Sequence, residues 1–545
     1  MIKLYKQLIH ISLIFTATTS FAQQVKLSAN VEQAMQQVSP DDIKAHITYL
    51  ADDKLKGRGP GTEGYQMAVD YVVGQLKSLD VKPAGENNTW LQTVRLRKAF
   101  IGDANLSISN GPANSTTITK GKDYVVYPNP LLPQVSVNPA QLAFVGYGIS
   151  EPALGYDDYA GIDVKGKIVI ITRGAPDKFS SSVSAHVMNA SQILKVAAQH
   201  GAVGVIMGSA DSAARVANIS RGVYSIMDDK GAVSVSRTFY SKQLSLYASI
   251  NYALFSSLLE QAGKNLKEIL PQLKAGQPSS MLLKASAGAS LTSTYQDILS
   301  YNVIGKIEGS DPKLKNEYVV HSAHLDHLGI DKPVQGDSIY NGAHDNASGV
   351  ASVISIAKIY HSIKVKPKRS ILVVLVTGEE LGDLGSNYFA KHPTVPVKSM
   401  VADVNTDMPT IIAPLLSITA LGAEHSSLEK NVAQAAAYMG LDVEPDPEPK
   451  QARFTRSDQY SFVLEGIPAL HIKYGAKTAD GKNNLNDFVA TWRAKYYHKP
   501  QDDINGIFDF EAGKKYAQLN FLIGYLVAQD PAWPTWNPGD IFATR

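Results

Sequence analysis

The chain has 545 residues, with 52 basic and 50 acidic side chains and no cysteine. A chain of this length can form more than one domain, each with a core of its own. The near balance of charge, without long runs of one sign, argues against binding to nucleic acid or to an anionic membrane surface. The absence of cysteine excludes disulfides, thiolate chemistry and cysteine-based zinc sites, so His, Asp and Glu would have to hold any metal.

The N-terminus has the organisation of a secretory signal peptide. Lys3 and Lys6 precede an apolar run over residues 8–15, and residues 20–22 offer a cleavage site after Ala22. The run is too short and too polar to be a membrane anchor, and no later segment approaches the roughly 20 apolar residues of a transmembrane helix. We therefore expect an exported protein, periplasmic or secreted, with no membrane span.

Helical and β patterns then follow each other along the chain. Residues 39–82 look helical, with a Ser39-Pro40 start and an interruption by four glycines within residues 56–64. Short strands and turns are expected from about residue 103. Residues 130–285 are β-rich, with one helix-like segment over residues 189–201.

From about residue 300, apolar strands alternate with helical segments. Continuous apolar runs such as "SILVVLV" indicate parallel strands that are buried on both faces. The sequence therefore predicts an α/β fold with a mixed, mostly parallel sheet flanked by helices, and a β-rich block that is an insertion or a separate lobe set into it. The expected parts are the signal peptide (1–22), the two pieces of the α/β domain (23–128 and 286–545) and the insertion (129–285).

Polar side chains follow three of these strands where each strand ends. His324 and Asp326 close "YVVHSAHLD", Glu379 and Glu380 close "SILVVLVTGEE", and Asp407 closes "MVADVNTD". Open α/β sheets bind ligands beyond the carboxyl ends of their strands. We expect these groups to meet at one edge of the sheet.

Two more candidates lie in loops, Asp345 in "NGAHDNASG" and His498 in "KYYHKPQDD". Imidazoles and carboxylates without thiols suit zinc or a similar divalent ion. A two-metal hydrolytic site needs ions about 3.5–4 Å apart, and Asp345 lies in a glycine-rich turn where a short carboxylate could bridge them. One of the adjacent glutamates could bind metal while the other acts as a general base. Asp326 could accept the second ring N–H of His324.

Each of these features has a simpler explanation when it is taken alone. An aspartate after a strand is usually a cap, and paired glutamates at a strand end commonly form a solvated helix N-terminus. A histidine in a polar loop is most often just exposed. Their occurrence together, in this order and at strand ends, favours a metal site.

Six segments resemble, in order, the co-catalytic zinc aminopeptidases, the exopeptidase family that also contains glutamate carboxypeptidase II and the transferrin receptor. They are "HSAHLDHLG", "NGAHDNASGVA", "RSILVVLVTGEELGDLGS", "NTDM", "RSDQYSFVLEGIPAL" and "YYHKPQDD". "YLADDKLKGRGPGTEG" resembles the opening segment of family members. "FVGYGI" with "VKGKIVIITRG" resembles a protease-associated domain, a common insertion in this family. The resemblance spans roughly residues 40–530 and implies the zinc exopeptidase fold.

The resemblance also implies a site for two Zn²⁺ ions per chain. Asp345 would bridge the two ions. His324 and Asp407 would complete one site, and Glu380 with His498 would complete the other.

The resemblance assigns catalytic roles as well. Glu379 would be the general base and Asp326 the partner of the histidine ligand that precedes it. Tyr497 matches a position whose hydroxyl could stabilise the oxyanion, with Tyr496 and Tyr460 as competing candidates.

The other histidines and the departures from the family pattern are minor. His321 is interpreted as a strand residue and His327 as a turn residue, with support of a neighbouring metal ligand as the alternative for His327. His344 stands where an acidic residue is expected beside the bridging aspartate, which changes local charge but removes no ligand. Gln459 replaces a frequent histidine of the "SD-x-YSF" motif.

The activity that the resemblance implies is hydrolysis of N-terminal residues from peptide substrates. A carboxypeptidase of the same fold is an alternative, in which Arg453 and Arg456 could bind the α-carboxylate. A glutaminyl cyclase, which uses one zinc ion on this fold, and a non-catalytic peptide-binding protein are disfavoured because every ligand position and the base are filled.

Overall fold

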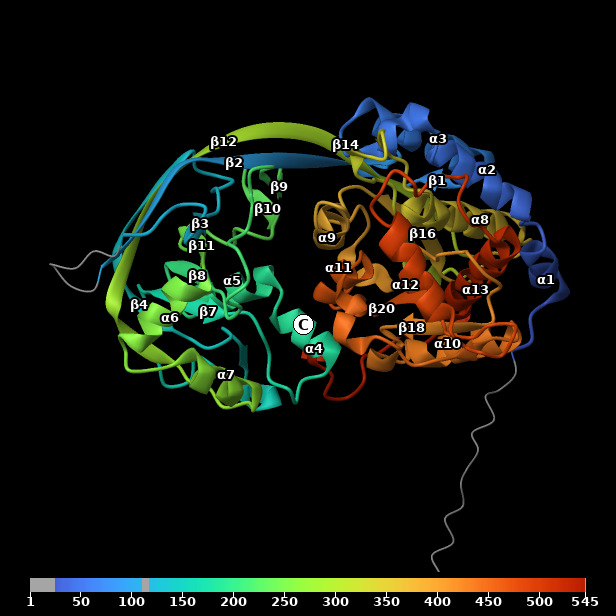
Figure 1. Cartoon of the computed structure of the whole chain (residues 1–545). Coiled ribbons are helices and arrows are strands. Elements are labelled where there is room, and N and C mark those ends of the chain that lie inside the picture. Colours follow the sequence, from blue (N-terminus) through green and yellow to red (C-terminus); the bar gives the residue numbers. More distant parts are fainter. Residues whose placement is uncertain (1–24, 110–116, 545) are drawn as a thin grey trace, which may run out of the picture.

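The computed structural model describes residues 25–109 and 117–544, so the predicted signal peptide lies outside the described residues. Figure 1 shows two lobes joined along one side by two long strands, β2 (Leu91–Ser109) and β12 (Met281–Ile307). These strands pair with each other in antiparallel fashion from the first lobe to the second. Short strands were expected from residue 103, whereas β2 begins at Leu91 and is continuous.

The sheet of the C-terminal lobe has the order β19–β18–β20–β17–β13–β16–β12. Its four central strands, β20, β17, β13 and β16, are parallel, and β18 and β12 flank them in antiparallel orientation. The expectation of a mixed, mostly parallel sheet is confirmed. The bounds are β13 (Tyr318–His324), β16 (Ser370–Val376), β17 (Met400–Asn405), β18 (Ser417–Leu421), β19 (Asp442–Val443) and β20 (Ala469–Tyr474).

Helices cover both faces of this sheet, which explains the continuous apolar strands. Val373 of β16 packs in the core under α8 and α13, and its neighbour Val374 packs in the opposite core with Phe389 of α9 and Phe462 of α11. The face on the side of Val373 has the larger core. It is covered by α1 (Ala29–Met35), α2 (Pro40–Leu50), α3 (Glu63–Ser78), α8 (Ser348–Ser362), α10 (Leu428–Tyr438) and α13 (Phe510–Gln529). The opposite face carries α9 (Leu384–Lys391) and α11 (Gln459–Leu464).

The inserted lobe has its own parallel strands, in the order β4–β7–β8–β11. It contains more helix than the sequence indicated, because only one helix, over residues 189–201, was expected; this helix is observed as α5. Asn251 and Asn265 cap two of the additional helices. The elements are β4 (Gln134–Phe144), β7 (Ile168–Thr172), β8 (Gly204–Gly208), β11 (Leu246–Ile250), α4 (Ser181–Val187), α5 (Ala190–Gln199), α6 (Tyr252–Glu260) and α7 (Leu266–Lys274).

The inserted lobe also touches the C-terminal lobe away from the long strands. His186 of α4 lies with its Nδ1 atom 2.5 Å from the hydroxyl of Tyr460 on α11. Ser234, in β10 (Val233–Ser236), lies 2.8 Å from His392 just after α9. These contacts fix the insertion against α9 and α11 of the C-terminal lobe. No described helix is long and apolar enough to cross a membrane.

Candidate metal centre

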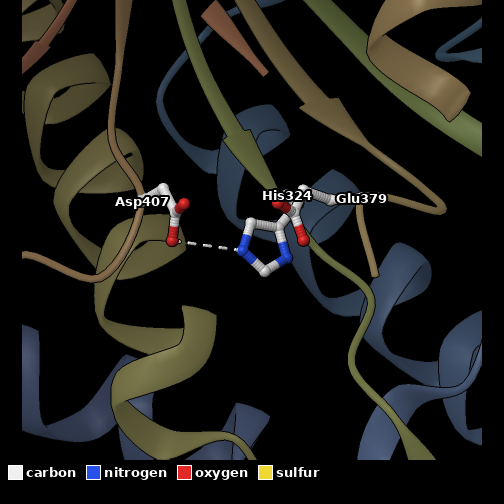
Figure 2. A group of neighbouring side chains, drawn as sticks. All are labelled: His324, Glu379 and Asp407. Atoms are coloured by element: carbon white, nitrogen blue, oxygen red, sulfur yellow. Dashed lines mark hydrogen bonds and ion pairs between the residues drawn. The ribbon is translucent and has the colours of Figure 1, made fainter. Parts of the chain in front are cut away.

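The strand-end residues meet at one edge of the sheet, as the sequence predicted. His324 is the last residue of β13, and Asp407 lies just after β17. Glu379 and Glu380 lie just after β16. Figure 2 shows His324, Glu379 and Asp407 converging, with the imidazole Nε2 atom 3.4 Å from Asp407 Oδ1.

The two loop residues reach the same place. Asp345 lies in the turn that leads into α8, and His498 follows α12 (Leu485–Tyr496). The turn depends on Gly342, which has a φ of 61°. A Cβ atom there would lie 2.0 Å from the carbonyl oxygen of Asp345 and 2.6 Å from the ring of His327. Only glycine therefore fits, which is the physical basis of the glycine-rich turn seen in the sequence.

Asp345 faces two histidines with its two carboxylate oxygens. Its Oδ1 atom is 3.3 Å from Nε2 of His324, and its Oδ2 atom is 3.2 Å from Nε2 of His498. The second histidine also lies 3.3 Å from Glu380 Oε2. The pairs His324–Asp407 and His498–Glu380 thus flank one shared carboxylate. This is the arrangement that a bridging ligand between two ions requires.

Glu379 borders the first of these pairs. Potential ligand atoms of Glu379, His324 and Asp407 all lie within 4.8 Å of one another. The backbone N–H of Glu379 donates to Asp326 Oδ1 at 3.2 Å. Asp326 therefore holds the loop that carries the predicted base.

Asp326 meets His324 differently from the expectation. The closest contact of the imidazole Nδ1 atom is the backbone carbonyl oxygen of Asp326, at 3.1 Å, while its carboxylate Oδ1 atom is 4.0 Å away. A carbonyl oxygen accepts only from a protonated nitrogen, so Nδ1 carries the proton and Nε2 is free to bind metal. The tautomer that the sequence analysis required is thus fixed mainly by the backbone.

His327 belongs to the site, which agrees with the alternative of a supporting role and not with the main expectation of a turn residue. Its side chain is fully buried, and Nδ1 lies 2.7 Å from Glu380 Oε1. Potential ligand atoms of His327, Asp345 and Glu380 lie within 4.8 Å of one another. The only signal in the sequence was a further histidine directly after the strand-end motif.

Arg58 is a second residue whose role the sequence did not reveal. Its buried guanidinium donates to the carbonyl oxygens of Leu325 and Gly342, each at 3.0 Å, and to that of Asn341. It therefore ties the loop after β13 to the turn that holds Asp345. Arg58 lies in the glycine-rich opening segment, which was noted only as a family resemblance.

Asp502, in the motif around His498, supports the bridging residue from the other side. Its carboxylate accepts the backbone N–H of His344 at 3.0 Å and that of Asp345 at 3.1 Å. The ring of His344 stacks on Phe508, with 4.1 Å between ring centroids. The histidine that replaces the expected acid is therefore a packed side chain beside the site.

The ionisation of the site follows from burial and from the close contacts. Burial acts to raise the pKa of Asp345, but hydrogen bonds from His324 and His498 hold it well below its usual range. Burial raises the pKa of Glu379 well above its usual range, although the charge of His324 opposes this. Burial alone would lower the pKa of His324, yet the surrounding carboxylates raise it.

The donor set fits zinc. Four carboxylates converge here, and burying several carboxylates together is costly unless cations or strong hydrogen bonds compensate. The surrounding histidines offer nitrogen donors, and imidazole with carboxylate is a ligand set that zinc accepts. The four acids are Asp345, Glu379, Glu380 and Asp407, and the three histidines are His324, His327 and His498.

The structure distinguishes the three tyrosines that were candidates for stabilising the oxyanion. Tyr497 lines the same cavity as Asp345 and Glu379. Tyr460 is engaged with His186 of the inserted lobe. Tyr496 packs against Trp492 within α12, with ring centroids 5.8 Å apart.

Comparison with known proteins agrees with this site. Residues 302–519 match the model of peptidase family M28, and residues 128–241 match that of the PA domain. Residues 302–519 thus form a peptidase domain of family M28. The M28 match contains all seven of the converging acids and histidines, and the PA match lies in the inserted lobe.

Individual relatives match parts of the chain. A probable leucine aminopeptidase 2 of Aspergillus oryzae is 25% identical over 221 residues, which are 38% of this chain and 41% of that protein. Carboxypeptidase Q of Rattus norvegicus is 32% identical over 121 residues, 22% of this chain and 23% of that protein. The chain thus spans less than two thirds of the length of these curated relatives. A solved aminopeptidase from Aneurinibacillus sp. strain AM-1 aligns with a TM-score of 0.47 and 19% identity, covering 93% of this chain and 98% of that chain.

Proposed function

We propose that the protein is an exported zinc-dependent aminopeptidase that removes N-terminal residues from peptides. The observation that carries the two-metal part of this proposal is the position of Asp345 between His324 and His498, with one carboxylate oxygen toward each. His324 and Asp407 would hold one ion with it, and Glu380 and His498 the other. The export rests on the signal-peptide pattern of residues 1–22.

When bound, zinc supplies Lewis acidity and lowers the pKa of a coordinated water molecule. Glu379 lines the cavity beside the ligands, where its carboxylate can accept a proton from water and pass it to the leaving amine. Tyr497 lines the same cavity, and its hydroxyl can donate a hydrogen bond to the oxygen of the scissile carbonyl. Arg58 and Asp502 keep the turn that holds Asp345 in place.

The choice of the N-terminus rests on relatives. The probable leucine aminopeptidase 2 of Aspergillus oryzae is named for this activity. A carboxypeptidase is the second candidate, and one structural observation favours it. The cavity beside the predicted ligands is lined by several cationic side chains. Arg453 is paired with Asp446, but Arg456 could bind a terminal carboxylate.

Mass spectrometry of one peptide in three forms tests the proposal. The forms are unblocked, N-acetylated and C-terminally amidated, each incubated with the zinc-loaded protein. We expect stepwise loss of N-terminal residues from the unblocked and amidated forms and no change in the acetylated form. Loss of C-terminal residues from the acetylated form would establish the carboxypeptidase instead. Stability of all three forms would overturn the exopeptidase function.

A further inference from the structure

A cavity of about 310 Å³ opens from the predicted metal ligands toward α12 and the loop around residues 448–456. Asp345, Glu379 and Asp407 form its inner end. Its volume lies at the lower end of the range for small-molecule sites, so it suits one or two amino-acid residues of a substrate. Whatever the cavity binds therefore lies beside the proposed reaction centre.

The wall of this cavity beyond the predicted ligands and base is cationic. It contains four basic side chains and one acid, Glu448, which is exposed and accepts a hydrogen bond from Gln451 at 2.6 Å. The basic side chains are Arg453, Arg456, Lys473 and Arg493. One of them is already neutralised, because Arg453 is paired with Asp446.

Arg493, on α12, lines the cavity and stacks on an aromatic ring. Its guanidinium lies over the ring of Tyr497, with 3.9 Å to the ring centroid, and one N–H approaches the sulfur of Met408 at 3.7 Å. In the part of the chain that the structure describes, no carboxylate lies within 4.0 Å of it. Stacking on an aromatic ring orients a guanidinium and leaves its N–H donors available for an anion.

Lys473 and Arg456 add to this charge without neutralising it. Lys473 donates to the backbone carbonyl oxygens of Asp407 and Met408, at 2.8 and 3.0 Å, so its ammonium lies next to a predicted metal ligand. Among the described residues it forms no ion pair within 4.0 Å. Arg456 is exposed at the cavity and forms no ion pair among the described residues. Three unneutralised cations thus converge on one small cavity.

We propose that this cavity binds a carboxylate of the substrate, with Arg493 as the main contact and with Lys473 and Arg456 supporting it. The inference rests on the proposed peptidase function and names its substrate class, peptides that carry an anionic group next to the scissile bond. A guanidinium that is oriented and unpaired can bind a carboxylate through two parallel hydrogen bonds. A neutral side chain in the same place would leave three cations without a counter-charge.

The carboxylate can come from two sources, an acidic side chain or the free C-terminus of a very short peptide. Matched substrates distinguish them. The side-chain arm compares Glu with Gln in the amidated tripeptides X-Ala-Ala and Ala-X-Ala, where the side chain is the only anion. The C-terminal arm compares Ala-Ala with Ala-Ala amide.

We expect the wild-type protein to have a kcat/KM about tenfold or more higher for the carboxylate member of at least one pair, which corresponds to about 1.4 kcal/mol. In Arg493→Gln this ratio should fall toward one, and Arg493→Lys should restore part of it. Lys495→Gln is the matched control, because it removes a charge from the same helix at an exposed position outside the cavity. It should keep the wild-type ratio.

A ratio near one for all three pairs in the wild-type protein would overturn the carboxylate site while leaving the peptidase function standing. A high ratio that survives in Arg493→Gln would also overturn it. Failure to hydrolyse any of the peptides would instead overturn the proposed function. The ratio is taken within each variant, so a partial loss of folded protein does not change it.

Discussion

His327 Nδ1 lies 2.7 Å from Glu380 Oε1 and so connects the loop after β13 with the loop after β16. Both side chains are almost fully buried. The contact fixes the orientation of a carboxylate whose other oxygen lies 3.3 Å from His498. His327 is therefore placed to orient Glu380 as a ligand at the metal position proposed for Glu380 and His498.

If the protein binds two zinc ions as proposed, His327→Ala should weaken the binding of one of them by about 10- to 100-fold, the usual effect of losing a group that orients a metal ligand. Competition with a chelator, followed by metal analysis, measures this. His361→Ala, at a partly exposed position on α8, is the control and should bind zinc like the wild type. Equal affinity in both variants would show that Glu380 needs no support from His327.

Asp345→Ala should release both ions, whereas His324→Ala should release only one. The reason is that Asp345 faces the ligand pairs on both sides, while His324 contacts only Asp345 and Asp407 among the predicted ligands. Metal content per chain after dialysis against buffer checks this. Two tightly held ions in either variant would contradict the ligand assignment.

Glu379→Ala should lower kcat by about 10²- to 10⁴-fold, the range for loss of a general base, while both zinc ions stay bound. Turnover and metal content are measured on the same preparation. Loss of an ion along with activity would make Glu379 a ligand, an outcome that its distance to His324 and Asp407 allows. Retained turnover with zinc bound would remove the base assignment.

Tyr497→Phe should lower kcat by about 10²- to 10³-fold if its hydroxyl stabilises the developing oxyanion. Tyr460→Phe provides the comparison, since Tyr460 contacts His186 of the inserted lobe. We expect it to affect stability more than turnover. A larger loss of kcat in Tyr460→Phe than in Tyr497→Phe would reverse the assignment.

His321 should make the fold sensitive to acid. Burial lowers the pKa of His321 to about 3, from 6.5, because the ring is enclosed beside Tyr360 and Gly524. Below pH 6.5 the unfolded chain binds a proton that the folded chain does not, so the free energy of unfolding falls as the pH decreases from 6.5 toward 3. Urea unfolding at pH 7 and pH 5 should show His321→Gln losing about 2 kcal/mol less than the wild type over this interval. An equal loss in both proteins would contradict the shift.

Much of the fold could be predicted from the sequence, because buried strands and helices leave a local pattern of apolar residues. The run "SILVVLV" predicted a strand covered on both faces. In the structure β16 is fully buried between the helix layer that contains α8 and the layer that contains α9. The helices of the inserted lobe were harder to predict, because α4, α6 and α7 are short and lie between strands of similar composition. Short amphipathic segments give too few turns for a helical period to stand out.

The residues of the site divide in the same way. The sequence by itself determined that His324, Glu379, Glu380 and Asp407 lie at strand ends, because parallel strands deliver their carboxyl ends to one edge. Only the tertiary structure decided which of their atoms meet. It also showed that His327 contacts Glu380, and that Arg58 joins two loops far apart in the chain. The direction of a side chain and the partner of a buried charge depend on distant segments, and local sequence does not encode them.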